Sequence, residues 1–474
     1  MASGKRLLMV VVVGFALAAA ATAASGGRHG RGRSKSAARL QLVPAVPGAS
    51  MAERARDDRH RHAYISARLA ASRHRRRAAE TARSPPVETS AFAMPLTSGA
   101  YTGTGQYFVR FRVGTPAQPF VLIADTGSDL TWVKCHGGAA SSAPRVFRPS
   151  DSKTWAPIPC SSDTCKSTIP FSLANCSSST SACSYDYRYN DDSAARGVVG
   201  TDSATVAIST GVAHGGGERK AKLQDVVLGC TTAYGGQGFE ASDGVLSLGY
   251  SNISFASRAA SRFGGRFSYC LVDHLSPRNA TSYLTFGSSS SSPPSSQTSS
   301  SSSWRTPLVL DARVRPFYAV TVDSVSVDGE ALEIPPEVWD VGSNGGTIID
   351  SGTSLTVLAS PAYKAVVAAL SAKLDGLGLP RVTMDPFEYC YNWTGGDDRA
   401  VVPRLAVQFA GAARLEPPAK SYVIDAAPGV KCIGVQEGVW PGVSVIGNIL
   451  QQEHLWEFDL NNRWLRFRQT RCTQ

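Results

Sequence analysis

Residues 123–131 read IADTGSDLT, and residues 348–356 read IIDSGTSLT. Each stretch is an apolar run followed by Asp, a small hydroxyl residue, Gly and a second hydroxyl residue, and each ends in Leu-Thr. A looser pair of segments lies downstream: residues 244–249 (GVLSLG) follow the first motif, and residues 444–448 (SVIGN) follow the second. The simplest account of this internal repeat is two related lobes, each of which supplies one aspartate.

The two aspartates of the repeat are Asp125 and Asp350. Because each follows an apolar strand, each carboxylate is expected at a partly buried strand end, where the neighbouring hydroxyls can donate hydrogen bonds to it. If the lobes pack symmetrically, the two carboxylates face each other and share one proton. The ionised member can then take a proton from water while the protonated member polarises a carbonyl. The pattern predicts hydrolysis of peptide bonds with no metal and no organic cofactor.

The rest of the chain predicts mainly β structure with scattered short helices. Apolar, β-rich runs bounded by Gly and Pro lie at 107–113, 120–124, 226–228, 318–327 and 455–458. The clearest helical pattern begins at Ser360, an N-cap candidate followed by Pro361, and runs through Leu374 to a stop near Gly376.

The excess of positive over negative charge in the chain lies entirely in its N-terminal fifth. The 474 residues carry 48 Lys+Arg and 37 Asp+Glu, a net charge of +11, and 43% are hydrophobic, which excludes a mainly disordered chain. Residues 1–96 hold 17 basic and 5 acidic side chains, whereas residues 97–474 hold 31 and 32. The second region therefore has no bulk electrostatic basis for binding polyanions, and we expect no nucleic-acid partner for the mature form.

Residues 1–23 are typical of a secretory signal peptide, with a basic start, an apolar stretch at 7–20 and a small-residue cleavage pattern at 21–23. The alternative is a chloroplast transit peptide. No later apolar run is long enough for a membrane span, so none is expected in the mature form. Residues 24–96 are interpreted as a basic pro-segment that ion-pairs with its own enzyme and loosens at low pH. A nucleic-acid-binding arm and a disordered basic tail are the alternatives.

All ten cysteines lie between Cys135 and Cys472. An even number behind a signal peptide predicts five disulfides, whereas a metal site needs close Cys pairs or His partners that the sequence lacks. Four Asn-x-Ser/Thr sequons are glycosylation candidates: Asn175, Asn252, Asn279 and Asn392. Residues 288–303, which are mostly Ser, predict a flexible loop. This loop separates an N-terminal lobe at 97–287 from a C-terminal lobe at 304–474.

The region 101–474 resembles the pepsin (A1) family of aspartic proteases, and specifically its plant nepenthesin-like branch. The resemblance is carried by the following motifs: GTP at 114–116, DTGS at 125–128, Trp132, the Cys-rich insert at 135–183, FSYCL at 267–271, DSGT at 350–353 and IGN at 446–448. It implies a mainly β, bilobal fold with an active-site cleft between the lobes and few short helices. It also implies a monomer that binds polypeptide substrates in extended form, with the chain's own pro-segment as a further partner.

The resemblance also assigns roles to single residues. Asp125 and Asp350 are the implied catalytic pair, and Ser128 and Thr353 hydrogen-bond their outer oxygens. The remaining support residues of the two motifs are Thr126, Gly127, Ser351 and Gly352, with the two glycines closing the turns.

Two more implied roles lie outside these motifs. Tyr189 corresponds to the tyrosine of the flap hairpin, which closes over substrate and excludes water. Trp132 supports the hydroxyl of this tyrosine through its indole N–H, although simple core packing is the alternative. Local spacing and the resemblance together favour disulfides Cys160–Cys165 and Cys390–Cys432.

Three features depart from the family pattern. The flap reads YNDDS at 189–193 where Tyr-Gly-Asp-Gly-Ser is usual, and Ser247 replaces the first glycine of Leu-Gly-Leu-Gly. The third departure is ten cysteines in place of twelve, which suggests five bridges instead of six. The first two open the question of whether flap shape and the backbone behind Asp125 are altered.

Three functions remain in competition. The first is an acid endopeptidase made as a secreted zymogen, in the apoplast or the vacuole. The second is a non-catalytic binding protein on the same scaffold, like the plant xylanase inhibitors. The third is a plastid protease with DNA affinity in its basic leader. Nucleophile elbows, Walker loops, His-Glu-x-x-His motifs and dinucleotide fingerprints do not occur in the sequence.

Overall fold

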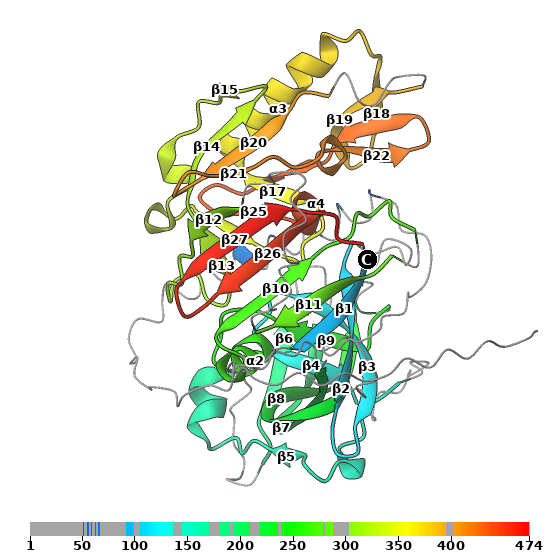
Figure 1. Ribbon diagram of the computed structural model, residues 1–474, viewed down its shortest axis with the longest axis vertical. Helices are drawn as coiled ribbons and strands as arrows, with labels where there is room; N and C mark the ends of the chain where they lie inside the picture. Colours follow the sequence, from blue (N-terminus) through cyan, green and yellow to red (C-terminus); the bar gives the residue numbers. More distant parts are fainter. Residues whose placement is uncertain are drawn as a thin grey trace, which may run out of the picture. The chain divides into compact units, whose positions relative to one another are not determined.

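The computed structural model covers the whole chain, and its described part is mainly β structure (Figure 1). The structure describes residues 51, 55, 58, 62, 65, 66, 92–98, 105–135, 145–169, 178, 181–188, 194–208, 219–235, 239, 241–277, 280–287, 303–394 and 402–473. The predicted signal peptide and nearly all of the Ser-rich loop lie outside these residues. None of the helices in the described part is both long and apolar enough to cross a membrane.

The largest sheet of the described residues has fourteen strands. Their order is β12 (Trp304–Pro307), β27 (Trp464–Gln469), β26 (His454–Asp459), β10 (Arg266–Cys270), β11 (Ser282–Phe286), β1 (Phe92–Ser98), β2 (Tyr107–Val113), β3 (Gln118–Asp125), β9 (Gly244–Ser247), β4 (Thr131–Lys134), β8 (Arg219–Gly235), β7 (Ala194–Ile208) and β5 (Ala156–Pro157), with β6 (Ser184–Arg188) paired to β7. The sheet joins both halves of the chain, because β26 of the C-terminal half pairs with β10 of the N-terminal half.

Three smaller sheets belong to the C-terminal half. The first is β13 (Tyr318–Val320), β16 (Thr347–Ile349), β25 (Ser444–Ile446), β17 (Thr356–Ala359) and β24 (Val435–Gly438). The second is β15 (Glu330–Ala331), β14 (Val322–Val327), β20 (Leu405–Phe409) and β21 (Ala413–Leu415), and the third is β18 (Arg381–Met384), β19 (Phe387–Asn392), β23 (Val430–Ile433) and β22 (Val423–Ala427). The predicted run at 318–327 is therefore two strands in two different sheets.

The helices of the described residues are few. They are α2 (Phe255–Arg262), α3 (Ser360–Asp375) and α4 (Asn448–Gln451), with short 3₁₀ turns at Pro149–Asp151, Pro336–Val338, Val341–Ser343 and Ala419–Ser421 and a π turn at Thr164–Thr168. Residues 51, 55, 58, 62, 65 and 66 are helical as well. Helix α3 packs against β14, β17 and β24. Its predicted cap is off by one residue: Ala359 is the N-cap, and the Ser360 hydroxyl instead donates to Glu437 Oε1 at 2.5 Å.

The internal repeat is preserved in the strand topology. In the N-terminal half, β9 runs parallel to β3 and antiparallel to β4, and β4 runs parallel to β8. In the C-terminal half, β25 has the same relation to β16 and β17, and β17 runs parallel to β24. The looser sequence match between 244–249 and 444–448 thus marks equivalent strands, and the two aspartates follow equivalent strands of two related lobes.

The β structure starts earlier than the sequence predicted. Strand β1 begins at Phe92 and lies between β11 and β2, pairing Phe92 with Phe286 and Ser98 with Tyr107. The predicted boundary between residues 96 and 97 therefore falls inside a central strand. Met94 and Leu96 are buried, which is why this short segment belongs to the sheet and not to the leader.

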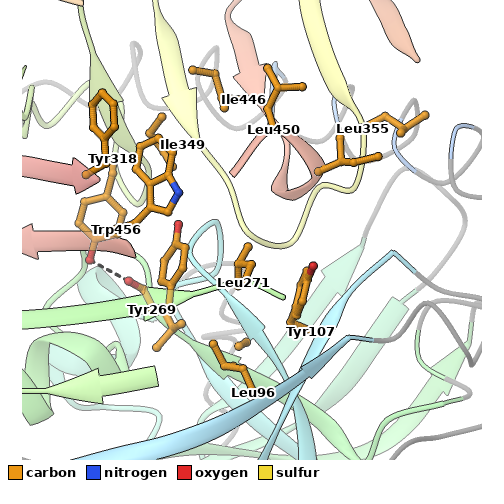
Figure 2. Close-up of a cluster of buried hydrophobic side chains, with 14 of the residues drawn as sticks. Leu96, Tyr107, Tyr269, Leu271, Tyr318, Ile349, Leu355, Ile446, Leu450 and Trp456 are labelled. Atoms are coloured by element: carbon orange, nitrogen blue, oxygen red, sulfur yellow. Dashed lines mark hydrogen bonds between the residues drawn. The ribbon is translucent and has the colours of Figure 1, made fainter. Parts of the chain in front are cut away.

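One hydrophobic cluster unites the two lobes (Figure 2). Leu96 and Tyr107 come from β1 and β2, whereas Ile349, Leu450 and Trp456 come from the C-terminal half, and all five are buried. Because this shared core lies around the strands that deliver both motifs, it fixes the position of one motif relative to the other.

The disulfides correct one of the two predicted pairs. The four bonds of known pairing are Cys135–Cys230, Cys165–Cys183, Cys270–Cys472 and Cys390–Cys432. The last was predicted, but the Cys160–Cys165 pair is wrong, although Cys160 is itself disulfide-bonded. Segment 158–160 runs antiparallel to segment 181–183, and the π turn then brings the Cα of Cys165 within 5.7 Å of that of Cys183.

Candidate active site

The two repeated motifs are joined by reciprocal hydrogen bonds between Thr126 and Ser351. The Thr126 hydroxyl accepts from the Ser351 backbone N–H at 2.9 Å and donates to the Ile349 carbonyl at 3.2 Å. The Ser351 hydroxyl accepts from the Thr126 N–H at 3.1 Å and donates to the Ala124 carbonyl at 2.9 Å. These four contacts place the turn after Asp125 directly against the turn after Asp350.

Each aspartate is held in the same way by its own motif. The Gly127 N–H donates to Oδ1 of Asp125, and the Gly352 N–H donates to Oδ1 of Asp350, both at 2.9 Å. The second oxygen of each carboxylate accepts a bond from the hydroxyl three residues on: Ser128 donates to Asp125 Oδ2, and Thr353 donates to Asp350 Oδ2 at 2.6 Å. The bonds that the resemblance implied for Ser128 and Thr353 are therefore present, and the two carboxylates have matching environments.

Both carboxylates are enclosed. Asp125 has 2% of its surface exposed and Asp350 has none. A buried carboxylate that keeps its charge needs hydrogen-bond donors, and the four bonds described above supply them. The enclosure also favours a shared proton if the two side chains approach each other, because two adjacent charges are poorly tolerated away from water.

Polar residues that were not among the predicted site residues support the second aspartate. Gln451 of α4 donates to the backbone carbonyls of Asp350, at 3.2 Å, and Ile446, at 2.8 Å. The Tyr269 hydroxyl donates to Gln451 Oε1 at 2.6 Å. Burial raises the pKa of Tyr269 well above its ordinary value, and the nearby charge of Asp350 acts in the same direction. Tyr269 is thus a neutral donor beneath the site.

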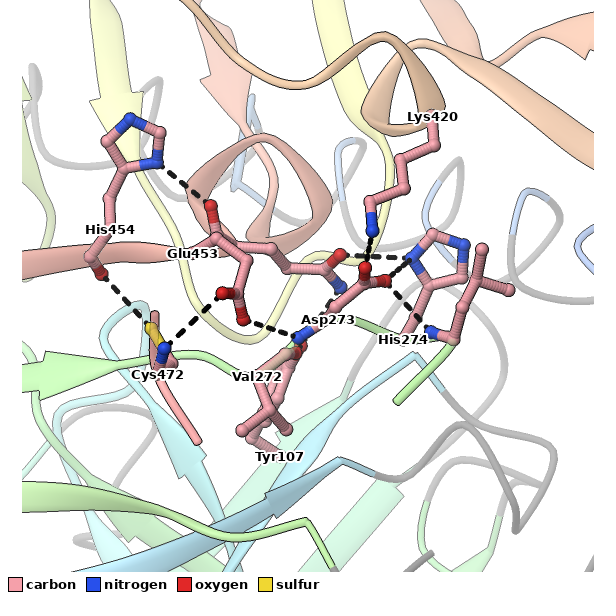
Figure 3. A network of polar contacts seen from close by, with 10 residues as sticks. Tyr107, Val272, Asp273, His274, Lys420, Glu453, His454 and Cys472 are labelled. Atoms are coloured by element: carbon pink, nitrogen blue, oxygen red, sulfur yellow. Dashed lines mark hydrogen bonds and ion pairs between the residues drawn. The ribbon is translucent and has the colours of Figure 1, made fainter. Parts of the chain in front are cut away.

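A second polar network closes the region where the N- and C-terminal halves meet (Figure 3). The Asp273 N–H donates to Glu453 Oε1 at 3.2 Å, and the Asp273 carboxylate forms an ion pair with Lys420. His274 Nδ1 hydrogen-bonds Gln452 Oε1 at 2.9 Å. The chain after β10 is therefore tied to the residues just before β26 and to the 3₁₀ turn at Ala419–Ser421.

The predicted flap tyrosine, Tyr189, lies outside the described residues. Trp132 is fully buried and packs edge-on against Phe239, with 4.9 Å between the ring centroids. Its indole nitrogen has no hydrogen-bond partner among the described residues. The structure instead shows that Tyr187, in β6, donates to Asp129. The buried carboxylate of Asp129, which directly follows the DTGS motif, has no local sequence signal of this role. It ties the β6–β7 pair, next to its Arg188–Ala194 end, to the first motif.

Ser247, one of the departures from the family pattern, is fully buried directly behind Asp125. It lies opposite Asp125 in the parallel β3–β9 pair. Its hydroxyl lies 2.7 Å from the Thr131 hydroxyl and accepts the Phe255 N–H at 3.0 Å, at the first residue of α2. The Leu248 N–H still donates to the Asp125 carbonyl at 2.8 Å. The serine therefore fits without displacing the backbone that carries the aspartate.

The sequons are only partly described. Asn252 and Asn392 are exposed, as glycosylation requires, whereas Asn175 and Asn279 lie outside the described residues. At Asn392, the side-chain oxygen accepts bonds from the N–H and the hydroxyl of Thr394, at 3.1 and 2.7 Å.

Comparison with known proteins agrees with this geometry. Two family models match, described as "Xylanase inhibitor N-terminal" over residues 107–288 and "Xylanase inhibitor C-terminal" over residues 317–469. Aspartyl protease family protein 2 of Arabidopsis thaliana is 32% identical over 376 residues, which cover 78% of this chain and 71% of the relative. Aspartic proteinase nepenthesin-2 of Nepenthes gracilis is 30% identical over 378 residues, which cover 78% and 79%.

Solved structures share the fold at lower identity. The crystal structure of edgp has a TM-score of 0.62 at 21% identity and covers 81% of this chain and 96% of that one. The basic 7S globulin from soybean has a TM-score of 0.58 at 20% identity and covers 81% and 95%. Fold, paired motifs and relatives together show that the chain belongs to the pepsin-like (A1) family of aspartic proteases. Within that family, it falls in the plant nepenthesin-like branch.

Proposed function

We propose that the chain is an aspartic endopeptidase that hydrolyses peptide bonds at acidic pH with a water molecule activated between Asp125 and Asp350. The observation that carries the proposal is the matching support of the two carboxylates. Each accepts one glycine N–H and one hydroxyl, and Thr126 and Ser351 link their two turns. A scaffold used only for binding has no need to hold two carboxylates in equivalent settings.

The mechanism follows from the environment of the two carboxylates. With one proton between them, the charged carboxylate takes a proton from the attacking water. The protonated carboxyl donates to the scissile carbonyl as it becomes tetrahedral, and the proton taken from water can pass to the leaving amine. The glycine and hydroxyl donors keep both side chains oriented throughout, so little reorganisation accompanies the reaction. Acidic pH is required because the pair must keep its single proton.

The residues before β1 have a separate proposed role, in targeting and in activation. We propose that they direct the chain into the secretory pathway, toward the apoplast or vacuole, and are removed to release the active enzyme. Because Phe92 already belongs to a central strand, removal at a site upstream of residue 92 leaves the sheet intact.

The test is acid incubation of the purified precursor, followed by N-terminal sequencing and a casein assay with and without pepstatin. We expect pepstatin-sensitive cleavage that is lost in both Asp125→Asn and Asp350→Asn. Isosteric amides keep the shape of the site but cannot share a proton. Proteolysis that persists unchanged in either variant would refute the proposed function.

A non-catalytic binding protein is the second candidate. It is favoured by the description of the two matching family models, whose name refers to xylanase inhibitors. A mature form that binds a glycoside hydrolase and never cleaves protein would establish it. The intact pair of motifs weighs on the side of catalysis.

A further inference from the structure

Two buried tyrosines lie at the boundary between the lobes. Tyr269 belongs to β10 of the N-terminal lobe, and Tyr318 belongs to β13 of the C-terminal lobe. Both are fully buried in the hydrophobic cluster that the lobes share (Figure 2). Both rings pack against Phe458, with 5.5 and 4.8 Å between the ring centroids. Phenylalanine would fill the same space, so the two hydroxyl groups have a role beyond packing, and each has a hydrogen-bond partner.

The Tyr269 hydroxyl is connected to the main chain of Asp350 through one residue. It donates to Gln451 Oε1 at 2.6 Å, and Gln451 Nε2 donates to the Asp350 carbonyl at 3.2 Å and to the Ile446 carbonyl at 2.8 Å. The main-chain carbonyl of Gln451 accepts the Trp456 indole N–H at 2.9 Å. Both amide hydrogens and the amide oxygen of Gln451 are thereby bonded, which fixes the orientation of this side chain.

Tyr318 makes the reciprocal connection to Asp125. Its hydroxyl donates to the Leu248 carbonyl at 2.7 Å, and the Leu248 N–H donates to the Asp125 carbonyl at 2.8 Å. Tyr318 itself lies opposite Ile349, the residue before Asp350, in the β13–β16 pair. Each tyrosine therefore belongs to one lobe and bonds to the segment that holds the aspartate of the other lobe.

Both connections end on the main chain of an aspartate. The carboxylate oxygens are already held by the glycine and hydroxyl donors of their own motifs. The tyrosines reach the peptide carbonyl of each aspartate instead, through a backbone N–H in one lobe and a side-chain amide in the other. They can therefore change where each carboxylate lies without contacting substrate or the reacting atoms.

Both hydroxyls stay neutral donors over the working range of an acid protease. Burial raises the pKa of each tyrosine well above its ordinary 10. The charge of Asp350 acts in the same direction on Tyr269, and Tyr250 does so on Tyr318. The two interlobe hydrogen bonds therefore persist throughout acidic and neutral pH.

We infer that Tyr269 and Tyr318 are positioning residues that set the distance and orientation between the two aspartates. The inference rests on the proposed function. Two carboxylates share one proton only while their oxygens face each other at close range. The bonds between Thr126 and Ser351 join the two turns directly, and the tyrosines tie the main chain of each aspartate to the opposite lobe. Loss of either hydroxyl leaves one aspartate free to shift against the other.

The test compares Tyr269→Phe and Tyr318→Phe with Tyr422→Phe in the mature enzyme. Tyr422 is the matched control, because it is buried and its hydroxyl donates to the Pro403 carbonyl at 2.7 Å and accepts the Leu405 N–H at 3.2 Å, all within the C-terminal lobe. Active sites are counted by titration with pepstatin. We expect kcat per site to fall at least about fivefold in the first two variants, with little change in KM, and to stay at the wild-type value in the control.

The pH profile of kcat separates positioning from a general loss of stability. Carboxylates that are less well aligned hold their shared proton less firmly, so the basic limb of the profile moves to lower pH and the acidic limb to higher pH. We expect this narrowing in Tyr269→Phe and Tyr318→Phe. A wild-type profile in these two variants, or equal narrowing in Tyr422→Phe, would overturn the inference.

A double-mutant cycle tests the route through Gln451. In a Gln451→Met background, Tyr269→Phe should not lower kcat further, because the tyrosine acts through the amide. A full effect of Tyr269→Phe in that background overturns this route.

Failure of the proposed function can be told apart from failure of the inference. A wild-type mature chain that never cleaves peptides counts against the proposed function. Hydrogen–deuterium exchange in the peptide covering residues 347–353 then decides the positioning role, because it requires no activity. Faster exchange in Tyr269→Phe than in Tyr422→Phe supports the role, and unchanged exchange in Tyr269→Phe overturns it.

Discussion

Replacing Ser351 by Ala tests the link between the two motifs. The change removes one hydroxyl that accepts the Thr126 N–H at 3.1 Å and donates to the Ala124 carbonyl at 2.9 Å. Ser351 is 2% exposed, so water cannot easily replace it. A buried donor left without a partner costs about 1–3 kcal/mol, and the second lost bond adds about 1 kcal/mol. We therefore expect unfolding free energy to fall by about 2–4 kcal/mol.

The same change should slow catalysis. Because the hydroxyl sets the distance between the two turns, its loss lets the aspartates shift relative to each other. A displacement near 1 Å in a catalytic group costs roughly 100-fold in rate. We expect kcat to fall by about 10- to 100-fold, with a smaller change in KM. Stability is measured by urea unfolding at neutral pH, where self-digestion is suppressed, and kcat with a peptide substrate at acidic pH.

The matched control is Ser351→Thr, which gives the second motif the residue that the first motif has at Thr126. The hydroxyl is retained, and the equivalent position in the first lobe already holds the extra methyl group. We expect near wild-type stability and rate. A Ser351→Ala protein with unchanged stability and kcat, or a Ser351→Thr protein as impaired as Ser351→Ala, would show that these bonds do not hold the site together.

Three further outcomes are expected. Burial lowers the pKa of His62 below its ordinary 6.5, against the opposing hydrogen bond to the Val443 carbonyl, so the packed position of His62 favours the neutral ring and loses stability as pH falls below about 6.5. His62→Gln should make the loss of this contact, monitored by limited proteolysis near residue 62, less dependent on pH, and an unchanged pH midpoint would contradict this. Ser247→Ala should lower unfolding free energy by about 1–2 kcal/mol through loss of its bond to the Phe255 N–H, measured by urea unfolding, with Ser247→Thr as the hydroxyl-retaining control. Removing the Cys390–Cys432 bond, which joins residues 42 apart, should cost about 4 kcal/mol, and a change below 1 kcal/mol would refute that reasoning.

The repeated motif could be found in the sequence because its chemistry is local. The glycine and hydroxyl donors to Asp125 and to Asp350 lie within three residues of each aspartate. Most residues of the site therefore belong to two short stretches of sequence. Many strands could be predicted because their apolar pattern is also local: the predicted run at 107–113 coincides with β2. Strand β1 was harder to recognise, because Pro95 interrupts its pattern.

The parts that escaped prediction depend on residues far apart in the chain. Cys165 pairs with Cys183 and not with nearby Cys160, because a strand-like pairing of two loops decides which sulfur is within reach. Gln451 supports Asp350 from 101 residues away, and no local pattern distinguishes it from a surface glutamine. In the sequence, Asp58 is one more charge in a charged leader. Its hydrogen bond from the Ser354 N–H joins residues 296 apart, so no local pattern reveals it.

The strands of the large sheet are synthesised in a different order from that in which they pair. Strand β10 has β26 as a neighbour, and the Cys270–Cys472 bond closes a loop of 202 residues across the same seam. On the ribosome, β10 therefore keeps an unpaired edge until β26 has been made, and such edges are prone to aggregate. We expect C-terminal truncations before β26 to damage the N-terminal lobe too, and the nascent chain to depend on chaperones until β26 has emerged.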